Sequence, residues 1–249
     1  MPSGVPATTT RLRTMLKRLP GARALANWLR CLLVPDHREI QRLRRAEAAR
    51  LLQPFPTTSE DRYPELFDAL AARLAGVAQP RILSFGCSSG EEVRALRMRM
   101  PQARIIGIDL NRLMIARARA ADPGHAQDYR CDGAPQPGER FDAVLALAVF
   151  RHGELEAQRP EYCTAILPFA RFEHGLALLD THLVPGGWLA LYNQHFRLGD
   201  TALAASYSPD PLRVTCHAPL TLLYGPDDRR IDGGCEVTAL FRKRGDGDA

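Results

Sequence analysis

Residues 81–93 read RILSFGCSSGEEV, and this stretch decides the fold class of the 249-residue chain. A short apolar run at 82–86 leads into a turn that contains Gly86 and Gly90, and a helical pattern follows at 89–99. Glycine adopts positive φ readily and lets a ligand approach the backbone closely. Because parallel sheets bind ligands outside the carboxyl ends of their strands, the stretch predicts a strand–turn–helix unit with a binding function.

Short apolar runs alternate with helical patterns on both sides of this stretch. Asp61 is placed to cap a helix that ends at Pro80. The remaining pattern predicts strands at 82–86, 104–109, 128–131, 141–148 and 187–193, and helices at 89–99, 112–121 and about 161–183. Two final strands, 212–224 and 235–242, follow one another without a helix and predict an antiparallel hairpin. We therefore expect an α/β fold: a doubly wound, mostly parallel seven-stranded sheet with an antiparallel C-terminal hairpin and helices on both faces.

The first 55 residues differ from the rest of the chain in charge and are predicted to form a basic, helical N-terminal extension. Residues 1–50 hold eleven Lys and Arg but three acids, so this segment carries +8, and the net +5 leaves −3 for the remainder. We expect the first ten or so residues to be disordered and helices at 11–19, 22–34 and 37–52. The predicted domains are thus 1–55 and 56–249.

The basic extension is compatible with three roles. It can cover the main domain as packed helices, contact an acidic membrane surface through residues 11–34, or act in targeting or in substrate recruitment. Since the body of the chain is not basic, we expect no DNA partner. No run approaches about 20 apolar residues, which excludes a spanning helix. The six cysteines form no CxxC pair, so we expect reduced thiols in a cytoplasmic protein and no metal site.

A carboxylate at the end of the next predicted strand extends the binding site. Asp109 follows Gly90 by 19 residues, and an acid at that position can accept hydrogen bonds from two ribose hydroxyls. Asn111 is placed to cap the following helix. The pair of motifs therefore indicates a cofactor that contains a nucleoside.

Three familiar nucleotide chemistries do not fit these residues. The loop lacks the GxGxxG spacing that holds a dinucleotide, and the chain has no GxxxxGK[ST] phosphate loop. The positions four residues before Lys17 and Lys243 are Arg13 and Ala239, so the Tyr-to-Lys spacing of a short-chain dehydrogenase is absent.

Over residues 61–195 the chain resembles the class I S-adenosylmethionine-dependent methyltransferases. FGCSSG (85–90) looks like the glycine loop of that family, and GIDLNRLMIARARA (107–120) looks like its second motif. RCDG (130–133) looks like the third motif. FDAVLALAVFRH (141–152) is similar to the fourth strand, and LVPGGWLALYN (183–193) is similar to the helix–turn–strand that follows it. The resemblance implies S-adenosylmethionine as cofactor, with Asp109 on the ribose, Leu110 beside the adenine and Asp132 near its amino group. The implied cofactor-binding residues are Phe85, Gly86, Cys87, Ser88, Gly90, Asp109, Leu110, Asp132, Gly133 and Ala148.

The catalytic residues are less well defined, because a methyl transfer mainly requires alignment and needs a base only for a protonated acceptor. His152 and His195 are the candidates for such a base. Members of this family that methylate the exocyclic amine of a nucleobase often carry Asn/Asp-Pro-Pro-Tyr after the fourth strand. Here that place reads ALAV (146–149), which argues against a nucleobase amine as the acceptor. Six aromatic residues are candidates to line an acceptor pocket: Phe150, Tyr162, Phe169, Phe172, Phe196 and Tyr207.

The function predicted from these features is methyl transfer to an O or N atom of a small molecule. Three alternatives stay open at this point: a methyltransferase that acts on a protein, peptide or RNA, a non-catalytic regulator that binds S-adenosylmethionine, and a nicotinamide-dependent oxidoreductase. The sequence predicts no oligomeric state.

Overall fold

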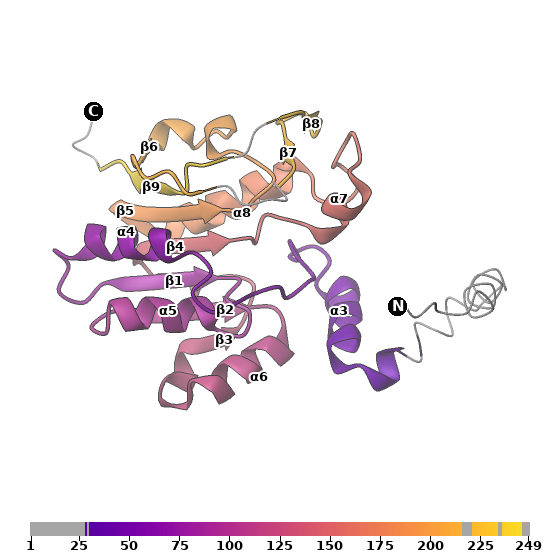
Figure 1. Cartoon of the computed structure of the whole chain (residues 1–249), viewed down its shortest axis with the longest axis horizontal. Coiled ribbons are helices and arrows are strands. Elements are labelled where there is room, and N and C mark those ends of the chain that lie inside the picture. The colour runs from indigo at the N-terminus through magenta and orange to yellow at the C-terminus, as the bar shows by residue number, and fades with distance from the viewer. Residues whose placement is uncertain (1–27, 29, 216–220, 234–235, 246–249) are drawn as a thin grey trace, which may run out of the picture.

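The computed structural model describes residues 28, 30–215, 221–233 and 236–245. Within them, a seven-stranded sheet has the order β3-β2-β1-β4-β5-β9-β6 (Figure 1). Its strands are β1 (Arg81–Phe85), β2 (Arg104–Asp109), β3 (Tyr129–Cys131), β4 (Phe141–Leu147), β5 (Leu183–Tyr192), β6 (Tyr207–Pro209) and β9 (Leu240–Lys243). The pairs among β1 to β5 are parallel, while β9 runs antiparallel to both β5 and β6. The predicted fold class is confirmed.

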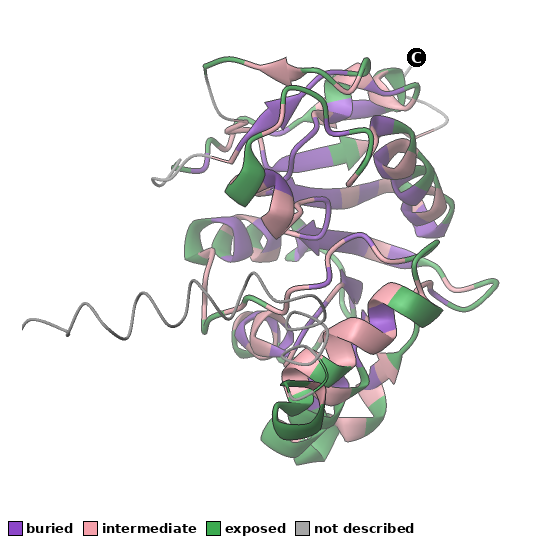
Figure 2. Cartoon of the chain, turned by 90° about the vertical axis from the view of Figure 1, so that its right-hand side faces the viewer, coloured by how far each residue is buried: buried purple, intermediate pink, exposed green. Residues whose placement is uncertain are grey.

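The helices that accompany the sheet are α3 (Pro35–Ala46), α4 (Pro64–Leu74), α5 (Glu91–Arg99), α6 (Arg112–Ala121), α7 (Gly153–Gln158) and α8 (Phe169–His182), and residues 28 and 30–33 are helical as well. Side chains of a strand point to alternate faces, and this divides the apolar core in two. Ile82 belongs to a cluster with α4, α5 and α6, whereas Leu83 belongs to a cluster with α7 and α8. Figure 2 shows the buried residues concentrated in the sheet and the exposed ones on the outer helices.

The helix α3 lies beyond the end of the sheet toward which β1, β4 and β5 point (Figure 1). The sequence predicted a helix at 37–52, but Pro35 begins the observed one because its missing N–H needs no partner in the first turn. Likewise α4 begins at Pro64, and Asp61 does not cap it. The predicted disordered residues and the helix at 11–19 lie outside the described residues, as does most of 22–34.

The predicted helix at 161–183 is wrong in its first third. Arg159 ends α7 with a φ of +48°, and Pro160 follows it. The next helix, α8, begins only after Pro168. A proline in a helix removes a donor and clashes with the preceding turn, so Pro168 ends the extended segment and α8 begins only after it.

The C-terminal hairpin exists, but one of its predicted strands is wrong. β9 pairs with Tyr207–Pro209 rather than with 212–224. Within 212–224 the described residues contribute a single bridge, from Arg213 to Thr238, and the short strand β7 (Leu223–Tyr224), which pairs with β8 (Arg230–Ile231) in a separate ribbon. The described residues also form 3₁₀ turns at Pro123–Asp128, Leu198–Asp200 and Ala204–Ser206.

Candidate functional site

A pocket opens at the carboxyl ends of β1, β2 and β4, with about 720 Å³ of space that includes open solvent. Eight residues expected to bind the cofactor line it: Phe85, Gly86, Ser88, Asp109, Leu110, Asp132, Gly133 and Ala148. Cys87 lines an adjoining pocket instead, and Gly90 packs behind the loop against the Tyr129 ring.

The glycine loop owes its shape to left-handed backbone. Gly86 has a φ of +74°, and a Cβ there would lie 2.6 Å from Val149 Cγ2. Gly90 has a φ of +84°, and its Cβ would lie 2.8 Å from the Tyr129 ring. Neither position tolerates a side chain without a shift, which explains why the turn carries glycine at both. Ser88 between them also has positive φ, and its hydroxyl is buried without a hydrogen-bond partner.

Asp109 joins the glycine loop to the end of β2. Its Oδ2 accepts a hydrogen bond of 2.9 Å from the Ser88 amide, and its Oδ1 accepts one of 2.8 Å from the Asn111 amide. Burial raises the pKa of the Asp109 carboxyl, while the two amides act to lower it. Each carboxylate oxygen keeps a lone pair, so the group can still accept two hydroxyl hydrogens from a ligand in the pocket.

Residues 47–57, which we call the strap, form the wall of the pocket opposite the sheet. Every residue from Arg50 to Thr57 lines it. The sequence prediction missed this wall and assigned these residues mainly to the extension. Residues 47–52 fall within the helix predicted at 37–52, and no periodic pattern continues past them; the local signal beyond that point is the apolar, proline-bounded stretch at 54–56.

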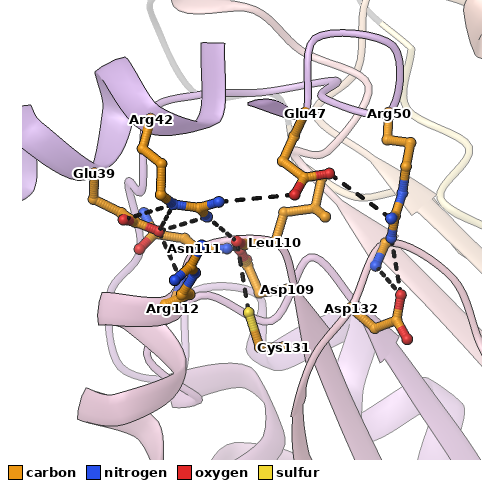
Figure 3. A network of polar contacts seen from close by, with 11 residues as sticks. Glu39, Arg42, Glu47, Arg50, Asp109, Leu110, Asn111, Arg112, Cys131 and Asp132 are labelled. Carbon is orange, nitrogen blue, oxygen red and sulfur yellow. Dashed lines mark hydrogen bonds and ion pairs between the residues drawn. The ribbon is translucent and has the colours of Figure 1, made fainter. Parts of the chain in front are cut away.

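A network of charges fastens α3 and the strap to the rim of the pocket (Figure 3). The guanidinium of Arg42 is paired with the Glu39 carboxylate and also donates a hydrogen bond of 3.0 Å to the Leu110 carbonyl. The same carboxylate accepts a hydrogen bond from the Arg112 amide at 3.1 Å. Leu110 and Arg112 follow closely after Asp109, the last residue of β2. These bonds therefore attach α3 to the loop next to Asp109.

The second attachment lies at the third motif. Arg50 Nη2 is 2.9 Å from Asp132 Oδ1, and both side chains are half exposed (Figure 3). The same guanidinium lies against Gly133, where a Cβ would be 2.5 Å from Nη2. The carboxylate expected near an adenine amino group therefore already has a cationic partner at the pocket rim.

The adjoining pocket extends the site past the glycine loop and shares Thr57, Gly86, Ser88 and Leu147 with the first. Glu92 contributes a carboxyl group to its lining, and Arg62 contributes a positively charged guanidinium. Burial raises the pKa of Glu92 to about 7, opposed by a 2.7 Å hydrogen bond from the Ser84 hydroxyl and by the Arg62 charge. The pocket thus combines one cation with one carboxyl group.

The structure brings His152 and His195 together, but neither lines the cofactor pocket. His195 is fully buried, with Nδ1 2.8 Å from the Leu222 carbonyl and Nε2 accepting from the His152 amide at 2.9 Å. Burial lowers its pKa. With both ring nitrogens bonded to backbone, His195 ties neighbouring segments together.

His152 caps α7 and faces a different cleft. Its Nδ1 accepts a hydrogen bond of 3.2 Å from the Glu154 amide, and burial lowers its pKa to about 4. The ring lines a cleft next to the cofactor pocket, together with Arg44 and Arg171. The aromatic residues expected to line an acceptor pocket lie elsewhere: Tyr162 is exposed, and the other five belong to the core.

In the part of the chain that the structure describes, no helix is long and apolar enough to cross a bilayer. Among the same residues, no three His, Cys, Asp or Glu side chains come together as metal ligands would.

Comparison with known proteins adds three findings. Residues 82–167 match the family model of a methyltransferase domain. A trans-aconitate 2-methyltransferase of Escherichia coli is 30% identical over 63% of this chain and 56% of its own length. A ubiquinone biosynthesis O-methyltransferase of Bradyrhizobium diazoefficiens is 41% identical over 29% of each chain.

Among solved structures, an amino pentose methyltransferase from Micromonospora echinaspora with SAM bound aligns with a TM-score of 0.39 and 25% identity, over 59% of this chain and 53% of that one. The match spans 56% of the length of the Escherichia coli relative and less than half of the length of the other curated relatives, for example 39% of a trans-aconitate 2-methyltransferase of Paracidovorax citrulli.

Proposed function

We propose that the chain is a class I S-adenosylmethionine-dependent methyltransferase that transfers a methyl group from S-adenosylmethionine to an O or N atom of a small molecule; residues 82–167, which match the methyltransferase-domain family model, support this. The observation that carries the proposal is the pocket itself. A glycine loop, a strand-end carboxylate and a third acidic motif line one pocket in the order that the family motifs have in the sequence.

The residues of the pocket fit the cofactor. Asp109 keeps free lone pairs for the ribose hydroxyls, and Leu110 lines the same wall for the adenine ring. The buried Ser88 hydroxyl has no partner in the protein, and a polar ligand satisfies such a group. The adjoining pocket, with Arg62 and Glu92, suits the carboxylate and ammonium groups of the amino-acid end.

Bound S-adenosylmethionine supplies an electrophilic methyl group on a positively charged sulfur. The protein's part is to orient the acceptor and to exclude water. Ala148 and Val149 line the pocket just after β4, and the strap closes the opposite side, so the space left beside the sheet is enclosed on two sides. Positioning of this kind supplies most of what a methyl transfer needs.

We propose His152, rather than His195, as the histidine that meets the acceptor. His152 lines a cleft that shares Leu51 and Pro54 with the cofactor pocket. His195 has no exposed surface and no free ring nitrogen.

The small size of the acceptor and the compartment are also part of the proposal. The relatives are named for trans-aconitate and for ubiquinone biosynthesis, which favours a small acceptor over a macromolecule. The four described cysteines, Cys31, Cys87, Cys131 and Cys163, are free thiols, as is usual in the reducing cytoplasm.

Calorimetric titration of the full chain with S-adenosylhomocysteine, beside NAD and ATP, tests the cofactor assignment. We expect micromolar binding of the first and none of the others. Binding of NAD alone would replace the proposal with an oxidoreductase. Transfer of an isotope-labelled methyl group to a panel of small acceptors then tests activity, and tight binding without transfer to any of them would favour a regulator.

A further inference from the structure

The cleft that holds His152 lies beside the cofactor pocket and separate from it. α3 and the strap supply one wall, and the start of α7 together with the segment leading into α8 supplies the other. Leu51 and Pro54 line both the cleft and the cofactor pocket, so the two spaces meet at the strap. The full lining is Arg44, Ala48, Leu51, Pro54, His152, Glu154, Ala165, Ile166 and Arg171.

The charge of this cleft is not balanced. Arg44 is paired with the carboxylate of Glu154. Arg171, on α8, has no carboxylate within ion-pair distance among the residues that the structure describes, and its hydrogen bond goes to the Leu51 carbonyl at 3.4 Å. Arg171 is only partly buried, and the Leu51 carbonyl takes one of the five N–H donors of its guanidinium, so other donors are left for an anionic ligand. The cleft therefore favours an anion near Arg171.

The His152 ring adds a donor at the same place. Its Nδ1 accepts a hydrogen bond from the Glu154 amide, and the low pKa of the ring keeps it neutral at pH 7. A neutral imidazole carries one proton, so the proton is on Nε2. Within the described structure no residue accepts a hydrogen bond from that Nε2–H. The ring is consequently arranged to donate a hydrogen bond, and it can take up a proton only at a cost.

The rest of the lining is apolar. Leu51 and Pro54 on the strap side face the same space as Ala165 and Ile166 on the other side. A ligand that matches this cleft has a compact apolar body and one anionic group. Arginine favours planar oxyanions, which its forked donors bind with two parallel hydrogen bonds.

We propose that this cleft is the acceptor site and that it binds the carboxylate of a small organic acid between Arg171 and His152 Nε2–H. The assignment as acceptor site rests on the proposed methyltransferase function, whereas carboxylate binding does not. The carboxylate anchors the acceptor, and the apolar part of the molecule extends past Leu51 and Pro54 toward the cofactor pocket.

The test uses the full chain, saturated with S-adenosylhomocysteine, and propionate as the probe. Titration is followed by NMR at the ring nitrogens of His152 and at Nε of Arg171. We expect saturable shifts with propionate at low ionic strength and none with propionamide, which has nearly the same shape without the charge. Shifts that are equal for the two probes, or that do not saturate, would overturn the proposal.

Three variants locate the effect. Arg171→Gln should weaken propionate binding at least fivefold, and Arg171→Lys should restore part of it, because the charge returns without the fork. Arg140→Gln is the matched control: Arg140 is an exposed arginine whose guanidinium also bonds to a backbone carbonyl, outside the cleft. If Arg140→Gln weakens binding as much as Arg171→Gln does, the cleft is not the site.

The same samples separate this inference from the proposed function. Calorimetric titration with S-adenosylhomocysteine should give the same affinity for the wild-type protein and for Arg140→Gln; Arg171→Gln loses the bond to the Leu51 carbonyl of the strap, so its propionate titration is made at saturating S-adenosylhomocysteine. If the wild-type protein does not bind S-adenosylhomocysteine, the methyltransferase proposal is contradicted. The carboxylate site is then judged by the NMR titration alone. Normal cofactor binding without a propionate effect contradicts only the carboxylate site.

Discussion

Asp109 has two tasks at the residue scale, because its carboxylate holds the amides of Ser88 and Asn111 while facing the pocket. Asp109→Ala removes the group proposed to accept the ribose hydroxyls. A hydrogen bond to a charged group contributes roughly 1.5–3 kcal/mol, so we expect calorimetry to show about a tenfold to hundredfold loss of S-adenosylhomocysteine affinity. The two amides lose their partner as well, and the melting temperature should fall.

Asp142→Ala separates the two effects. Asp142 accepts a hydrogen bond of 2.8 Å from the Arg81 amide, where β1 begins, at the end of the sheet away from the pocket. This variant should also lose stability but should bind S-adenosylhomocysteine as the wild-type protein does. Equal affinities in the two variants would show that Asp109 acts only on the fold.

Glu92 should give the protein a measurable pH dependence. Burial raises its pKa from 4.5 to about 7. Between those values the unfolded chain has released a proton that the folded chain keeps, so the free energy of unfolding falls as pH rises from about 4.5 to about 7. The stabilisation is fully present below pH 4.5. It is at most about 3 kcal/mol, since one pKa unit corresponds to about 1.4 kcal/mol and the side chain is only partly buried.

Urea unfolding at a series of pH values measures this effect as the difference between the wild-type protein and Glu92→Gln. Burial lowers the pKa of His152 from 6.5 to about 4, so this residue makes the free energy of unfolding rise with pH over that interval. His152 is present in both proteins, and its contribution cancels in the difference. Glu91→Gln, at the neighbouring position, should keep the wild-type slope. A difference between wild type and Glu92→Gln that does not change with pH contradicts the assignment.

At the scale of the element, α3 and the strap close the cofactor pocket through few contacts. Arg42→Ala breaks the bond to the Leu110 carbonyl and the pair with Glu39. We expect about fivefold weaker binding of S-adenosylhomocysteine by calorimetry, since one such bond is worth about 1 kcal/mol. Arg45→Ala removes the same charge from an exposed position of the same helix and should leave the affinity unchanged. If both variants bind alike, attachment of α3 does not support the cofactor site.

Elements whose signals are local were predictable from the sequence. The second strand was predicted at 104–109 and is observed as Arg104–Asp109, because a short apolar run bounded by turn residues has few other solutions. The helix predicted at 161–183 failed because apolar periodicity continued through Pro168, where the chain is extended. β6 was missed since three residues are too few to show a period of two.

At the scale of the whole molecule, the sheet side of the pocket followed from the sequence and the opposite side did not. Gly86 and Asp109 belong to motifs that can be recognised within about thirty residues. The contacts of the strap join distant parts of the chain: Arg42 reaches Leu110, and Arg171 reaches Leu51 across 120 positions. No local pattern encodes such pairs. The sequence places the N-terminal helices and the segment 150–170 on the acceptor side, but the contacts that join them into a cleft required the structure.

The uneven charge of the molecule separates the small-molecule proposal from a macromolecular acceptor. Residues 1–34 hold six Lys and Arg and no acid, so their removal changes the net charge from +5 to −1. Neutralised phosphates give nucleic-acid binding a steep salt dependence. We expect any binding of a short fluorescein-labelled RNA by the full chain, measured by fluorescence polarisation, to fall steeply between about 50 and 200 mM salt and to vanish on deletion of 1–34.

S-adenosylhomocysteine affinity is the control in this experiment, since the lining of the cofactor pocket, among the residues that the structure describes, begins at Leu43. It should be the same in the full and the shortened chain. Salt-resistant RNA binding that survives the deletion would place a nucleic-acid surface on the body of the protein, where the net charge gives no reason for one. That result would favour RNA as the acceptor and count against the small organic acid.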